Sequence, residues 1–142
     1  MKTKINNENK KNKLRWDLSI LEKEDFAKKR KEISLAHDKF INKWEKRTDW
    51  LKSSIILKEA LDEFEKLNRF YSNGAKELYY FWLRSEVEED NAEIKAKFNS
   101  VVNFSINLNN KLQFFELRLS RIDKKIQTKF INDPKLKEYK HF

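Results

Sequence analysis

The chain has 142 residues, of which 39% are hydrophobic and 39% are charged, and its formal net charge is +9. It contains one glycine, one proline and no cysteine, which excludes a disulfide framework, a thiolate metal site and a glycine-rich phosphate loop. So few turn residues also argue against a sheet built on tight hairpins. The length of one domain, combined with many lysine, glutamate, leucine and asparagine residues, predicts a single all-α domain of long, solvent-exposed helices.

The excess positive charge lies at the two ends of the chain. Residues 1–15 carry six Lys or Arg and one Glu, residues 124–142 carry six Lys and two acids, and the body between them is balanced. A nucleic-acid binder usually gathers its positive charge on a folded face with base-reading groups nearby, so we predict no nucleic-acid partner. The composition instead predicts a disordered basic tail over residues 1–13 and a helical domain over residues 14–142.

The N-terminal residues are basic, but they are not followed by an apolar stretch of the length that a secretory signal needs. No apolar run approaches the length that crosses a membrane either. We therefore expect a cytoplasmic protein with no membrane partner.

The first helix is predicted over residues 23–46. Apolar anchors precede it, with Ser19 and Glu22 at capping-box spacing, and apolar residues then recur at steps of three and four. His37 lies on or near this stripe. It could serve as a metal ligand or an acid–base group, but we interpret it as a hydrogen-bonded residue at the edge of a helix contact.

A second helix is predicted over residues 54–72. The connection before it contains Trp50, expected to be buried, and Ser53, expected to cap the helix. Asn73 and Gly74 follow, and both residue types readily adopt the left-handed conformation that ends many helices.

Residues 78–83 are six consecutive apolar or aromatic residues within a third predicted helix. A helix that is apolar all round must be buried on several sides or must face a partner. Tyr79, Tyr80 and Trp82 are therefore candidates for a stacking or substrate-channel surface. The simpler alternative assigns them to the core and to an interdomain contact.

A fourth helix, much longer than the others, is predicted over residues 91–132. Its stripe follows the heptad pattern of an antiparallel bundle or coiled-coil seam. The members of this seam are Ile94, Phe98, Val101, Ser105, Leu108, Leu112, Phe115, Leu119, Ile122 and Ile126. Such a helix would be about 60 Å long, so we expect part of the seam to lie against material that the first three helices do not supply. Its one polar member, Ser105, is interpreted as bonding back to its own helix.

A last helix is predicted to begin at Asp133 and Pro134, which suit the cap and the first turn. The residues after the cap are too few for a helix that is stable alone, so this helix needs something to pack against. With it, the sequence predicts an antiparallel bundle of about four helices, one of them very long.

Residues that could carry out catalysis are sparse. His37 and His141 are the only histidines in the sequence, and neither has the His-Glu-x-x-His spacing of a zinc hydrolase or a candidate nucleophile singled out beside it. Residues 88–90 are acidic, but a run of charge at a helix junction is usually solvated. We therefore assign no catalytic, cofactor-binding or metal-binding residue to this chain.

Five stretches occur in order along residues 14–142, namely WDLSIL, LKEALDEFEKL, YYFWLRSEVEEDNAEIKAKFN, NKLQFFELRLSRI and PKLKEYKHF. Together they resemble the N-terminal region of the oligoendopeptidase F group of thimet-like, M3-type zinc metallopeptidases. That resemblance implies a largely helical cytoplasmic peptidase that cleaves short peptides inside an enclosed channel. Its zinc would be held by a His-Glu-x-x-His helix and a downstream Glu, all beyond Phe142.

The resemblance further implies that this chain is the N-terminal helical lobe of a larger helical peptidase, truncated at its C-terminal end. Such a lobe would wall the substrate channel, would have the remainder of its own polypeptide as partner, and would be inactive alone because it lacks the His-Glu-x-x-His motif. The alternative hypothesis is a non-enzymatic protein–protein interaction module that forms a homo-oligomer through the long helix, at Leu112 and Leu119.

Overall fold

The computed structural model describes residues 17–70 and 75–141. Every regular element within them is helical, so the predicted all-α fold class is confirmed. In chain order the elements are α1 (Ser19–Glu22), α2 (Phe26–Trp44), the 3-10 helix η1 (Asp49–Leu51), α3 (Ser54–Phe70), α4 (Ala75–Val87), α5 (Ala92–Ser120), α6 (Lys124–Asn132) and the 3-10 helix η2 (Pro134–Tyr139). The predicted basic tail and the predicted helix-ending pair Asn73 and Gly74 lie outside the described residues.

The start of the first long helix differs from the prediction. The side chain of Asp25 accepts a hydrogen bond from the Lys28 backbone N–H (3.0 Å) and caps α2. The capping box predicted at Ser19 and Glu22 is wrong, because the backbone N–H of Ser19 instead donates to Asp17 (3.1 Å). The result is a separate single turn, α1, ahead of α2.

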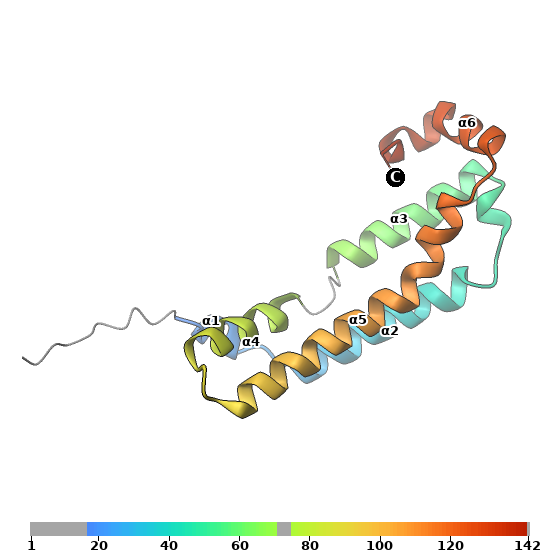
Figure 1. The fold of residues 1–142 in the computed structure, drawn as a ribbon. Coiled ribbons are helices and arrows are strands. Elements are labelled where there is room, and N and C mark those ends of the chain that lie inside the picture. Colours follow the sequence, from blue (N-terminus) through green and yellow to red (C-terminus); the bar gives the residue numbers. More distant parts are fainter. Residues whose placement is uncertain (1–16, 71–74, 142) are drawn as a thin grey trace, which may run out of the picture.

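The two longest helices, α2 and α5, lie side by side and run parallel (Figure 1). Near the start of α2, the guanidinium carbon of Arg30 lies 5.5 Å from the ring centre of Phe104. Further along both helices, the ring centres of Phe40 and Phe115 are 5.3 Å apart. Residue numbers therefore increase in the same direction along α2 and α5, which shows that the two helices are parallel.

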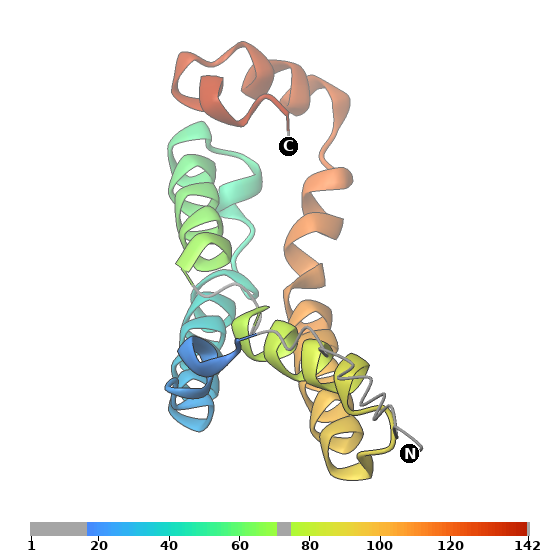
Figure 2. The same ribbon diagram turned by 90° about the vertical axis from the view of Figure 1, so that its left-hand side faces the viewer.

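The return path between these parallel helices is divided between α3 and α4 (Figures 1 and 2). Lys43, near the end of α2, donates to Glu59 in the first half of α3 (2.7 Å). At the other end of α2, the rings of Phe26 and Tyr80 in α4 are 5.4 Å apart. Thus α3 and α4 run antiparallel to α2 in tandem, each covering one half of the pair formed by α2 and α5.

Two hydrophobic clusters result, and α2 and α5 pass through both. The upper core gathers residues of α2, η1, α3, the end of α5, α6 and η2. The lower core gathers residues of α4 and the first half of α5, with α1 and the start of α2 packed against them. Trp50 is completely buried in the upper core, as predicted, and its ring stacks on Phe115 at 4.8 Å.

His37 lies between the two clusters on α2 and is completely buried. Its Nδ1 is 2.7 Å from the carbonyl oxygen of Ile33, one turn earlier. The interpretation as a hydrogen-bonded packing residue is confirmed, but the residue is central to the helix contact and not at its edge.

The predicted helix over residues 91–132 is wrong in length, because α5 ends at Ser120 and α6 begins at Lys124. Asp123 leaves the helical backbone conformation (φ −55°, ψ 138°), and its side chain accepts a hydrogen bond from the Lys125 N–H (2.9 Å). This capping interaction competes with continuing the helix. With 29 residues, α5 is about 44 Å long.

Half of the long seam is buried within this chain, and the expectation that the rest meets material beyond the first three helices stays a prediction. Five seam residues are buried, namely Ile94, Val101, Leu108, Leu112 and Phe115. The other five are half-buried. No single return helix matches α5 in length, but α3 and α4 in tandem do, and α6 turns back to bring Ile122 and Ile126 against the upper core.

The predicted helix start at Asp133 and Pro134 is correct, and the segment is the 3-10 helix η2. Asp133 caps it by accepting from the Lys135 N–H (2.9 Å). Its packing partner is α3, because Leu136 is buried in the upper core and the Tyr139 hydroxyl lies 2.5 Å from Asp62. The short segment is therefore stabilised within this chain.

Tyr139 also lies 3.1 Å from Glu65, so two carboxylates of α3 share its hydroxyl. Burial, reinforced by these two carboxylates, raises the pKa of Tyr139 well above its usual value. Conversely, burial would raise the pKa of Asp62, but hydrogen bonds from Lys58 and Tyr139 lower it overall.

The Tyr139→Phe substitution should lower the free energy of unfolding by about 1 kcal/mol at pH 7, because a hydrogen bond to carboxylate is lost at a partly exposed site. The folded state holds the phenol proton more tightly than the unfolded chain, whose tyrosine pKa is about 10. This stabilisation is therefore present below about pH 10 and is lost as the pH rises further. Urea unfolding should show a smaller difference between wild type and variant at pH 11 than at pH 7; an unchanged difference would contradict this assignment.

None of the helices within residues 17–70 and 75–141 combines the length and apolarity needed to cross a membrane.

Candidate interaction surface

The helix α4 carries all three aromatic residues that the sequence nominates, and its inner side is anchored by a charged pair. The Glu77 carboxylate, on a buried side chain, accepts two hydrogen bonds from the Arg30 guanidinium of α2, at 2.7 and 2.8 Å. This bidentate geometry fixes the orientation of the two side chains as well as the distance between them. It sets which face of α4 turns inward.

Tyr80 belongs to the inner face of α4 and is buried in the lower core. Its hydroxyl donates to Glu22 of α1 (3.1 Å) and accepts from Arg84 (3.2 Å). Its ring also meets Phe81 edge-on at 5.0 Å. With its hydroxyl and ring both engaged by the chain itself, Tyr80 positions α4 and does not contribute an exposed surface.

Tyr79 and Trp82 project from the outer face of α4, with 60% and 43% of their surfaces exposed. Three positions apart on a helix, they are neighbours, and their rings meet edge-on at 6.2 Å. Aromatic groups with this much exposed surface are typical of contact sites, because they bury a large area with few rotatable bonds. We call this pair the outer aromatic pair.

A shallow hollow of about 350 Å³ lies one helical turn beyond Trp82, between α4 and the start of α5. It is lined by Ser85, Glu86, Glu89, Lys95, Phe98 and Asn99. The outer aromatic pair and part of this hollow therefore lie on the same helix, α4.

The long helix offers no comparable surface at the residues proposed for self-association. Leu112 is buried in the upper core, and Leu119 is half-buried against it. The homo-oligomer hypothesis needs both side chains at an outer face, so the structure does not favour it.

The acidic run at residues 88–90 serves the turn between α4 and α5. Glu88 accepts hydrogen bonds from Arg84 (2.7 Å) and from the Asn91 side chain (2.8 Å), which fits a structural role. Among the described residues, no three His, Asp or Glu side chains are grouped so that they could hold a metal. The residues present here therefore do not fit a zinc site, and no catalytic step can be derived from them.

The Arg30–Glu77 pair is one interaction that sequence reasoning missed. Glu77 stands three and four positions before Tyr80 and Phe81 and shares their buried face, so helical spacing groups the three once the inward face is known. Nothing in the sequence pattern, however, indicated which distant cation would meet it.

Comparison with known proteins gives one informative similarity. The chain is 31% identical over 130 residues to the "Oligoendopeptidase F homolog" of Borreliella burgdorferi (strain B31). The similarity covers 89% of this chain but 20% of that protein, so the chain spans about a fifth of its relative's length. No protein-family model matches the chain. No solved structure matches it either. The chain is thus distantly similar, over most of its length, to part of an oligoendopeptidase F-type protein.

Proposed function

We propose that this chain is a non-catalytic helical module of a zinc-dependent oligoendopeptidase, equivalent to the N-terminal lobe of such an enzyme. The observation that carries the proposal is the similarity to an oligoendopeptidase F homolog over 89% of the chain. In this proposal the zinc and the catalytic groups belong to a separate part of the enzyme.

In this role the module is a wall of the enclosed channel in which short peptides are cleaved in the cytoplasm. The parallel pair α2 and α5, braced by α3 and α4 in tandem, makes a stiff scaffold for such a wall. A closed channel restricts entry to small peptides and excludes water from the reacting groups. The contribution of this chain is positioning and exclusion.

The outer aromatic pair, Tyr79 and Trp82, is the proposed contact of the module with the catalytic part or with peptide in the channel. Tyr80 and the Arg30–Glu77 pair hold α4 so that these two side chains stay on its outer face. Exposed aromatic side chains in a chain this highly charged are best explained by a partner.

Complementation in trans tests this function. The chain alone should not cleave a quenched fluorescent peptide, whereas mixing it with the Borreliella burgdorferi relative lacking the matching region should form a complex and restore chelator-sensitive cleavage. The double substitution Tyr79→Ala, Trp82→Ala should weaken that complex at least tenfold in sedimentation velocity. The matched control is Leu35→Ala, which removes an apolar side chain of α2 that is 69% exposed and borders a hollow lined by α2 and α3 residues.

Two results would refute the proposal. One is chelator-sensitive peptidase activity in the pure chain, which would mean that the site assignment is wrong. The other is failure of the wild-type chain to form any complex with the catalytic polypeptide, which would remove its role as a module of the enzyme.

A further inference from the structure

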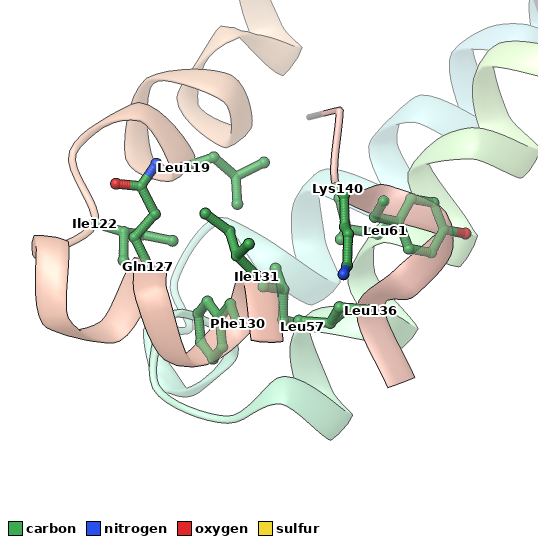
Figure 3. Close-up of a pocket in the computed structure, with 10 residues that line it drawn as sticks. Leu57, Leu61, Leu119, Ile122, Gln127, Phe130, Ile131, Leu136 and Lys140 are labelled. Atoms are coloured by element: carbon green, nitrogen blue, oxygen red, sulfur yellow. The ribbon is translucent and has the colours of Figure 1, made fainter. Parts of the chain in front are cut away.

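A largely apolar cavity of about 120 Å³ lies where α6 and η2 fold back over the first half of α3 and the last turn of α5 (Figure 3). It exists because the chain breaks at Asp123 and turns back, which leaves space between the returning segment and α3. The lining residues are Leu57, Leu61, Leu119, Ile122, Gln127, Phe130, Ile131, Leu136, Tyr139 and Lys140. Seven of these ten side chains are aliphatic or phenyl, and the other three, Gln127, Tyr139 and Lys140, carry polar groups.

The size and lining of this cavity define what it can hold. An apolar cavity of about 150 Å³ stays dry and binds benzene, so a space of this order accepts one branched aliphatic or phenyl group. Filling the cavity would bury apolar surface against Leu57, Leu61 and Phe130 without separating any hydrogen-bonded pair that the structure shows.

The polar groups of the cavity lie at its mouth. Gln127 and Lys140 are exposed residues, and Figure 3 shows the Lys140 ammonium directed into the space beside Ile131 and Leu136. The Tyr139 hydroxyl is directed instead to Asp62 and Glu65 of α3, so it is engaged elsewhere. The mouth therefore offers one ammonium and one neutral amide.

The surrounding charge favours an anion. Residues 124–142 carry six lysines against two acids, Asp133 and Glu138. The nearby α3 carboxylates Asp62 and Glu65 share the Tyr139 hydroxyl, and Asp62 also pairs with Lys58, so Lys140 is the charged group among the lining residues. A carboxylate placed beside this ammonium gains attraction and a fixed orientation.

We propose that this cavity binds the carboxyl-terminal residue of a short peptide whose last side chain is leucine-sized or phenylalanine-sized. The side chain fills the cavity, the Lys140 ammonium pairs with the terminal carboxylate, and the Gln127 amide hydrogen-bonds the last peptide group. A carboxylate, an amide and an apolar side chain on one carbon are the chemistry of a peptide C-terminus. The choice of a peptide over a simple apolar acid rests on the proposed peptidase-related function. The description of the cavity and of its charge does not depend on that function.

Calorimetric titration of the 142-residue chain with acetylated tripeptides tests the proposal. Acetyl-Ala-Ala-Leu with a free carboxylate should bind, its C-terminal amide should bind at least tenfold more weakly, and acetyl-Ala-Ala-Asp should not bind measurably. Equal binding of the acid and the amide would overturn the assignment. So would isocaproate binding as tightly as the leucine peptide, because the peptide group would then contribute nothing.

Substitutions at the mouth separate the site from general charge. Lys140→Gln should reduce the affinity for the free acid to that of the amide, and the matched control Lys137→Gln, on the same segment but not lining the cavity, should leave it unchanged. Because both side chains are exposed, neither variant should unfold. Equal loss in both variants, or in neither, would refute a site at Lys140. The titrations do not involve the catalytic part of the enzyme. A negative result would therefore refute the peptide site but not the proposed function, which the complementation experiment tests.

Discussion

The Phe115→Ala substitution should lower the free energy of unfolding by about 3–5 kcal/mol, because it removes a fully buried ring from the centre of the upper core. The Phe115 ring lies 4.7 Å from Phe64, 4.8 Å from Trp50 and 5.3 Å from Phe40, measured between ring centres. It therefore joins α5 to α2, η1 and α3 at one point. Removing it leaves a cavity that three separate elements would have to collapse to fill.

Urea unfolding followed by circular dichroism measures this effect as a lower midpoint with an unchanged slope. The matched control is Leu117→Ala, two positions along α5, where the side chain is 42% exposed and the expected loss is below about 1 kcal/mol. A loss below about 1 kcal/mol in Phe115→Ala as well would mean that the ring is not central to the fold.

The second large effect is expected at the Arg30–Glu77 pair. Arg30→Ala should cost about 2–3 kcal/mol, because it leaves the Glu77 carboxylate, whose side chain is 8% exposed, without its two charged hydrogen bonds. The Arg30 side chain is itself 30% exposed, so water reaches the pair and the cost falls below that of a fully buried one. The contact of Arg30 with Phe104 is lost as well.

A double-mutant cycle distinguishes a specific pair from general packing. Replacing both Arg30 and Glu77 by Met should lower the free energy of unfolding by less than the sum of the two single replacements by Met, because no buried charge is then left without its partner. The control is Glu32→Ala, which breaks the exposed ion pair with Lys29 on the same helix and should change stability by less than about 0.5 kcal/mol. Additive single effects at Arg30 and Glu77 would show that the two side chains act independently.

A run of apolar residues predicts that a helix has partners, but it does not predict which of its side chains are buried. The sequence indicated that residues 78–83 form a helix apolar all round, which must be buried on several sides or face a partner, and it made Tyr79, Tyr80 and Trp82 candidates together. Helical spacing alone could not divide them, because a stripe that is apolar all round has no preferred inward direction. The polar neighbours made the division: Glu77 meets Arg30 and the Tyr80 hydroxyl meets Glu22, which leaves Tyr79 and Trp82 outside.

The sequence by itself determined the all-α class, the burial of Trp50, the seam that carries Phe115, and the start of η2 at Asp133. These follow from helical periodicity and capping chemistry, which act between residues close together in the chain. The tertiary structure decided what periodicity leaves open: where α5 breaks, what covers its seam, and which charge meets Glu77. A heptad pattern specifies which face of a helix is apolar, but it specifies neither the partner of that face nor the end of the helix. The same apolar stripe is compatible with one long helix and with two helices that are separated at Asp123. Only once α6 and η2 fold back against α3 does the apolar cavity beside Lys140 exist.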